Sequence, residues 1–119
     1  MDNQPAPSEV HDVSLRLFMR EDSRHQGMPM HEWLLEEARR HGLSGGSAFR
    51  AVAGFGRHGV MHEETFFELA GKLPLMTEFI VSEADAESFV GRLGDAGIAL
   101  PYTLTRIRQG VTGGSPGDT

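Results

Sequence analysis

The residues best suited to chemistry lie in the run Gly54-Phe55-Gly56-Arg57-His58-Gly59, which combines glycines, an aromatic ring, a guanidinium and an imidazole. Glycine lets a ligand approach the backbone closely, and the N–H groups of Gly54 and Gly56 can then face an anion. The alternative interpretation is a sharp turn that needs positive φ. The run therefore indicates either an anion site or a tight turn.

A second candidate pair, Arg106 and Arg108, stands two positions apart near the C-terminus. Because side chains alternate along a strand, we expect both guanidinium groups on one face, about 7 Å apart. Such a pair can grip a diphosphate or a dicarboxylate through bidentate hydrogen bonds. The alternatives are a solvated sheet edge and cross-strand ion pairing with Glu78.

A third set, His58, His62 and Glu63, offers ligands for a divalent metal ion such as zinc. Residues four apart share a face if the stretch is extended, although no established zinc spacing is matched. The alternative is that these are exposed loop histidines that bind nothing.

Enzymatic chemistry is not indicated by any motif. The chain has no Ser/His/Asp order around an elbow, no phosphate-binding P-loop and no pair of carboxylates in apolar surroundings. We therefore expect a protein that is not an enzyme.

Composition narrows the classes of partner and compartment. The net charge of −6 argues against nucleic acid and anionic membranes as partners. The 119 residues contain no cysteine, no apolar run of membrane-spanning length and no signal-peptide pattern at the start. We expect a cytoplasmic protein with no membrane insertion.

Hydrophobic periodicity predicts one domain, residues 13–110, between two disordered tails, residues 1–12 and 111–119. Alternating or continuous apolar residues predict four strands, over residues 13–20, 47–55, 75–81 and 102–108. Apolar residues at helical spacing predict two helices: the first starts at Pro29 and stops at Gly42, and the second is capped by Ser82 and stops at Gly97.

The resulting order βαββαβ predicts a ferredoxin-like α+β fold, a four-stranded antiparallel sheet with two helices on one face. We expect Phe49 and Ala51 on the covered face of the second strand, and Arg50 and Val52 on the uncovered face. Because the uncovered face mixes apolar and arginine side chains, it suggests burial against another subunit. The alternative is an ordinary sheet with one face exposed to solvent.

The connection between the second and third strands is longer than compact domains usually allow. It contains histidine, glutamate, arginine and paired phenylalanines, which disfavours a disordered linker. We interpret residues 57–72 as a functional loop.

Several stretches of the chain together resemble the PII-like family catalogued as domain of unknown function 190. They are Arg16-Leu17-Phe18-Met19-Arg20-Glu21-Asp22, the Gly54-Phe55-Gly56-Arg57 turn, and Leu73-Pro74-Leu75 before an apolar strand that ends in Ser82-Glu83. The resemblance covers residues 13–108, nearly the whole predicted domain.

More distantly, the chain resembles the PII nitrogen-regulatory signalling proteins, which are ferredoxin-like homotrimers that bind adenine nucleotides between subunits. Residues 54–59 look like the Gly-Phe-Gly-Arg-Gln-x run that lines their nucleotide site, with His58 in place of the glutamine. Arg106-Ile107-Arg108-Gln109-Gly110 resembles their phosphate-gripping Arg-Ile-Arg-Thr-Gly segment. The resemblance implies a ligand site formed by these residues: Gly54, Phe55, Gly56, Arg57, His58, Arg106 and Arg108.

Three functions follow as hypotheses. The first is a homotrimeric regulatory protein that binds a small anionic metabolite, with an adenine nucleotide as candidate, and signals to a partner protein through residues 57–72. The second is a divalent metal-ion binding or tolerance protein of the same architecture that uses His58, His62 and Glu63. The third is a ligand-free oligomeric module that regulates an ion channel or transporter by contact.

Overall fold

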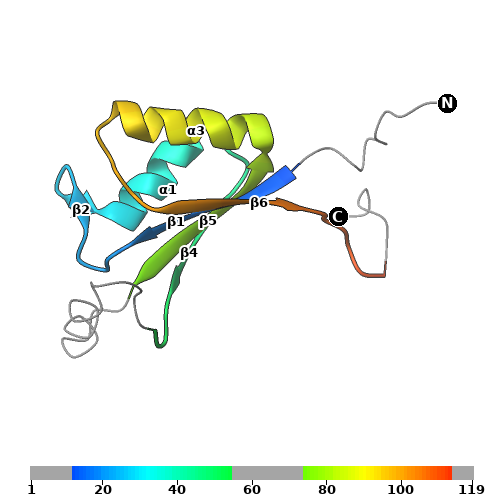
Figure 1. The fold of residues 1–119 in the computed structure, drawn as a ribbon, viewed down its shortest axis with the longest axis horizontal. Helices are drawn as coiled ribbons and strands as arrows, with labels where there is room; N and C mark the ends of the chain where they lie inside the picture. The colour runs from blue at the N-terminus through cyan, green and yellow to red at the C-terminus, as the bar shows by residue number, and fades with distance from the viewer. Residues whose placement is uncertain (1–11, 55–73, 114–119) are drawn as a thin grey trace.

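The computed structural model describes residues 12–54 and 74–113. Four strands form one antiparallel sheet in the spatial order β4-β5-β1-β6. Two helices pack on one face of this sheet (Figure 1). The elements of this layer pair are β1 (Asp12–Met19), α1 (Met30–Arg40), β4 (Ser47–Arg50), β5 (Leu75–Ser82), α3 (Glu83–Asp95) and β6 (Tyr102–Ile107). The α+β class, the four-stranded sheet and the two helices are thus confirmed.

A small hairpin precedes the first helix, with strands β2 (Arg24–His25) and β3 (Met28–Pro29). Its turn holds Gln26 and Gly27 at positive φ, 51° and 82°. Two successive residues at positive φ are what a two-residue hairpin turn of the type I′ kind requires. The hairpin was not predicted from the sequence, because each of its strands is only two residues long.

The core lies between the sheet and the helices, and the central strand β1 supplies one complete face of it. Leu15 and Leu17 are almost fully buried, and Phe79 of β5 lies opposite Leu15 in the strand register. The ring of Phe79 meets that of Phe89 from α3 edge to face, with centroids 5.5 Å apart. Such buried aromatic and aliphatic contacts stabilise the packing of helices on the sheet.

The helix boundaries follow the predicted signals closely. The hydroxyl of Ser82 accepts a hydrogen bond from the backbone N–H of Asp85 at 3.1 Å, which caps α3. Gly97 and Gly42 adopt positive φ just after the ends of α3 and α1. Pro29 is the N-cap of α1 and not its first helical residue. The helix therefore begins at Met30, one residue later than predicted.

Strand β4 differs from the prediction in both length and orientation. It ends at Arg50, and residues 51–54 are not in a strand. Phe49 lies opposite Met76 and Arg50 opposite Leu75, so Phe49 is on the uncovered face and Arg50 on the helix side. The prediction that Phe49 is on the covered face and Arg50 on the uncovered face was therefore wrong. A short edge strand has no apolar alternation strong enough to set its register, and a shift of one residue exchanges its faces.

Strand β6 ends at Ile107, one residue before the predicted end at Arg108. Among the described helices, none is long and apolar enough to cross a membrane.

Candidate functional site

The candidate arginine Arg106 projects toward the helix layer from the edge strand β6. It lies opposite Val13, whose side chain is buried in the core, and cross-strand partners share a face. Its guanidinium lies 3.5 Å from a carboxylate oxygen of Glu83, the first residue of α3. The expected alternative, pairing with Glu78, is wrong, because β1 separates β6 from the strand that carries Glu78.

The second candidate arginine, Arg108, follows the last residue of β6 and is exposed. Its neighbour Gln109 donates a hydrogen bond to the carboxylate of Asp12 at 2.6 Å, which holds this end of the chain against β1. Within residues 12–54 and 74–113, Arg108 itself has no ion pair or hydrogen bond through its side chain.

The glycine candidate Gly54 is the last described residue after β4. Its φ is not in the left-handed region, and a Cβ added there would meet no atom within 4 Å. The expected turn with positive φ is thus not found at this glycine. The remaining candidates lie outside the described residues; they are Phe55, Gly56, Arg57, His58, His62 and Glu63.

The end of β4, which leads to Gly54, and Arg106 of β6 lie at diagonally opposite corners of the sheet. Strands β4 and β6 are its two edges, so about 14 Å of sheet separates them. Along the strands, Arg50 is level with Met19 and Arg106 is level with Val13, a further separation of about 20 Å. One small ligand cannot touch both corners of the same chain.

Metal binding finds no support in the described residues, which contain no group of three histidine, aspartate or glutamate side chains able to hold an ion. The metal ligands proposed from the sequence all lie outside that part of the chain.

A polar cluster that was not predicted occupies the middle of the sheet face that the described helices α1 and α3 leave uncovered. Glu78 accepts hydrogen bonds from Arg16 Nε and Ser14 Oγ, each at 2.9 Å. These hydrogen bonds lower the pKa of the Glu78 carboxyl below its ordinary value, and the bond from Arg16 contributes more than the bond from Ser14. Phe18 and Ile80 on the same face are partly exposed. The sequence signal for this cluster was that Glu78 interrupts an otherwise apolar predicted strand.

A second charged cluster joins the two helices. The carboxylate of Glu37, whose side chain is 9% exposed, accepts a hydrogen bond from Arg92 Nε of α3 at 3.0 Å. His41 lies 3.0 Å and Arg40 lies 3.4 Å from the same carboxylate. The hydrogen bond from Arg92 lowers the pKa of Glu37, with a smaller contribution from His41. This cluster links α1 to α3.

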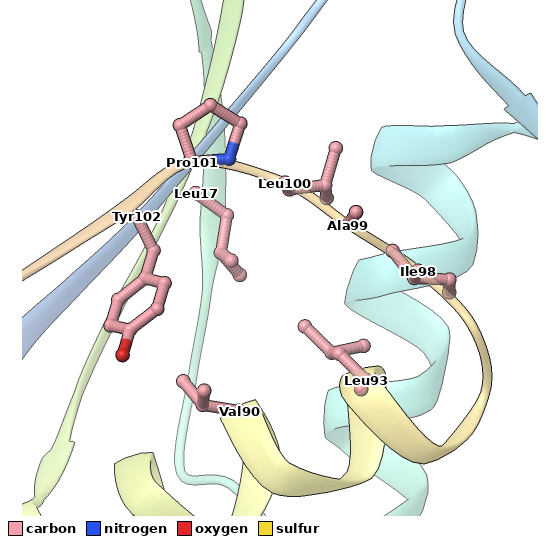
Figure 2. A pocket seen from close by; sticks show the side chains of 9 residues that line it. Leu17, Val90, Leu93, Ile98, Ala99, Leu100, Pro101 and Tyr102 are labelled. Atoms are coloured by element: carbon pink, nitrogen blue, oxygen red, sulfur yellow. The ribbon is translucent and has the colours of Figure 1, made fainter.

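The described residues also form an apolar cavity of about 380 Å³ beside the edge strand β6 (Figure 2). Its walls come from β1, the C-terminal half of α3, the connection after α3, and the start of β6. The lining residues are Leu17, Val90, Leu93, Gly94, Ile98, Ala99, Leu100, Pro101 and Tyr102. Sequence reasoning missed this cavity, although the run Ile98-Ala99-Leu100-Pro101 is unusually apolar for a connection.

Comparisons with known proteins agree on one family. The family model described as DUF190, "Uncharacterized ACR, COG1993", matches residues 12–107. The chain is similar to a "UPF0166 protein" of Aquifex aeolicus, with 37% identity over 76 residues, 64% of this chain and 72% of the relative. It is also similar to "UPF0166 protein MJ1524" of Methanocaldococcus jannaschii, with 27% identity over 79 residues, 66% of this chain and 72% of the relative.

Proposed function

The chain belongs to the DUF190 family, and from this membership and the divided anion site we propose that it is a PII-like regulatory protein. It acts as a cytoplasmic homotrimer that binds a small anionic metabolite between subunits, with an adenine nucleotide as the first candidate. Residues 54–58 of one subunit would meet Arg106 and Arg108 of its neighbour. The mechanism is recognition and switching, and residues 57–72 carry the signal to a partner protein.

The chain topology supports a ferredoxin-like fold for each subunit. Helix α1 connects β1 to β4, and α3 connects β5 to β6. In each connection the two strands are separated in the sheet by one antiparallel strand, β5 in the first case and β1 in the second. Two interleaved crossovers of this kind are the ferredoxin-like pattern.

The observation that carries the proposal is that the end of β4 at Arg50, four residues before Gly54, and Arg106 lie at opposite corners of one sheet. A site that needs both must draw them from different copies. Head-to-tail contacts between different surfaces close into rings when the rotation allows it. A ring of three subunits would place one such site at each of its interfaces.

The state of the arginines is compatible with a ligand at these interfaces. The side chain of Arg106 is 70% exposed, and that of its partner Glu83 is 42% exposed. An exposed pair at 3.5 Å contributes little free energy, so an incoming anion can replace it at small cost. Arg108 has no competing partner in the described part of the chain.

The uncovered sheet face supports association of subunits. Phe49 of β4 is 47% exposed and lies opposite Met76 of β5. On its other side, Met76 lies opposite the partly exposed Phe18 of β1. Apolar side chains around a polar centre are a common composition for a surface buried between subunits. A domain of this size also gains stability by burying more of its surface.

Calorimetric titration of the protein with ATP, ADP and inorganic phosphate tests the proposal. We expect nucleotide binding that is lost in the double variant Arg106→Ala/Arg108→Ala, because the phosphate contacts are charge-assisted. Arg39→Ala is the matched control, since Arg39 is an exposed arginine that pairs with Glu36 on the same helix, α1. Equal affinities of the double variant and the control would refute the site.

Light scattering tests the assembly directly. Three chains of 13.0 kDa predict a mass of 39.0 kDa (3 × 13.0). A monomer at micromolar concentration would remove the site between subunits. A trimer that binds neither nucleotide nor phosphate would instead favour the ligand-free module that acts by contact.

A further inference from the structure

We propose that the cavity between α3 and β6 binds the aliphatic chain of an amphipathic carboxylate whose head group is held by Arg106. This site lies within one chain, so it does not depend on the trimer or on a nucleotide. Its volume of about 380 Å³ is within the range of small-molecule sites.

The lining determines which part of a ligand can enter. Leu17, Leu93 and Ile98 are buried, and none of the nine lining residues is charged. The phenol of Tyr102 is the only polar side chain among them (Figure 2). A charged group placed here would lose its hydration without gaining a partner, so the inserted part of the ligand is uncharged and apolar.

The strand register connects this cavity to a positive charge. Tyr102, Leu104 and Arg106 lie opposite buried core residues of β1, so all three are on the helix side of β6. Leu104 is partly buried against the core and continues the apolar surface between the other two. Four residues of extended chain place Arg106 about 13 Å from Tyr102.

The head group is identified by the charges around Arg106. A guanidinium binds a carboxylate or a phosphate through two parallel hydrogen bonds. Glu83 lies 3.5 Å from Arg106, and its negative charge repels a dianion more strongly than a monoanion. For a head group held by Arg106 alone, within one chain and without Arg108 or a second subunit, the surroundings therefore favour a carboxylate over a phosphate monoester.

Tyr102 is 46% exposed at the start of an edge strand, so the cavity is accessible from the surface of the chain. The competing occupant is an apolar side chain from a second copy. A carboxylate with an aliphatic chain fits better, because it matches both the uncharged walls and the guanidinium beyond them.

The experiment is a calorimetric titration of the full chain, without nucleotide, using decanoate, decyl phosphate and decanol as probes. The blocking variant is Gly94→Leu, because Gly94 lines the cavity and a Cβ there meets no atom within 4 Å. Gly91→Leu is the matched control: it makes the same substitution one turn earlier in α3, at an equally open position outside the cavity. Both substitutions favour the helix, so neither should impair folding.

We expect the unmodified protein and Gly91→Leu to bind decanoate alike, and more tightly than decyl phosphate. Gly94→Leu should weaken binding at least about tenfold, since it displaces several buried methylene groups of the ligand. Arg106→Gln should weaken decanoate binding about threefold to fivefold and leave decanol binding unchanged, as expected for a partly exposed ion pair.

Equal decanoate affinities for Gly94→Leu and Gly91→Leu, or no binding of decanoate at about millimolar concentration, would overturn the proposal. So would a change in assembled mass in Gly94→Leu without loss of decanoate binding, because the cavity would then be a subunit contact. Methyl NMR shifts of Leu93 and Val90 on titration locate the bound chain. Gly94→Leu leaves the proposed nucleotide residues intact, so the two proposals can fail separately.

Discussion

Arg16 and Glu78 face each other directly across the two central strands, and Arg16 Nε donates to Glu78 Oε2 at 2.9 Å. The same oxygen accepts the hydroxyl of Ser14, a residue that is itself buried. This pair places a charged, hydrogen-bonded centre on the face of the sheet that the helices leave uncovered. It also gives that face a defined polar point around which a second subunit can be aligned.

The Glu78 carboxylate should contribute to stability at neutral pH. We expect Glu78→Gln to lower the free energy of unfolding by about 1 kcal/mol, because a charge-assisted acceptor is lost. The pKa of Glu78 is lowered in the folded state, so its contribution is present above the unfolded pKa and is lost as the pH falls through the folded pKa. Urea unfolding from about pH 7 downward should therefore show the stabilities of the two proteins converging as the pH falls through the folded-state pKa of Glu78. Glu87→Gln, at an exposed position of α3, is the control.

The Glu37 carboxylate should matter more, because it is buried between two helices. We expect Glu37→Ala to cost about 2 kcal/mol, since Arg92 and His41 lose their shared acceptor. Glu36→Ala is the matched control on the same helix, where an exposed pair with Arg39 predicts a change within about 0.5 kcal/mol. Thermal or urea unfolding of both variants measures the difference. Similar values for the two would show that Glu37 does not connect the helices energetically.

Gly46 should resist substitution for a packing reason. A Cβ at this position would come within 2.6 Å of Phe79 Cδ1 and 3.1 Å of a methyl of Leu35. Because Phe79 is fully buried, its ring cannot move aside freely, and we expect Gly46→Ala to destabilise the protein by about 1–3 kcal/mol. Gly45→Ala has open space and should be neutral or slightly stabilising. A neutral Gly46→Ala in chemical denaturation would show that the ring relocates easily.

Phe49 tests whether the uncovered face is an interface. We expect Phe49→Asp to reduce the assembled mass toward that of one chain, because an unpaired charge would be buried between subunits. Val52→Asp, at a position 94% exposed, should leave the mass unchanged. Light scattering and circular dichroism together separate dissociation from unfolding. An unchanged mass for Phe49→Asp would place the subunit contact elsewhere.

Much of the fold could be predicted because the signals are local. The alternation of Val13, Leu15 and Leu17 defines a strand with one apolar face, and β1 has that face buried. Ser82 and Gly97 mark the two ends of α3 because capping depends on residues adjacent in sequence. For the candidate site, the prediction that Arg106 belongs to a strand near the C-terminus was also confirmed, because it too rests on a local sequence pattern.

The partners of individual side chains could be identified only from the order of the strands in the sheet. Sequence spacing allowed Arg106 to pair with Glu78, yet β1 lies between their strands and Glu83 is the actual neighbour. The cavity beside Tyr102 likewise arises where a helix, a connection and two strands meet, and none of these shows it alone.

By itself, the sequence determined the class of fold, the central strands and the ends of the second helix, because periodicity and capping are properties of neighbouring residues. Only the tertiary structure decided that Phe49 is on the face away from the helices, and that the end of β4 and Arg106 occupy opposite corners. Register and strand order depend on contacts between residues far apart in the chain. Such contacts arise from packing the whole sheet against its helices.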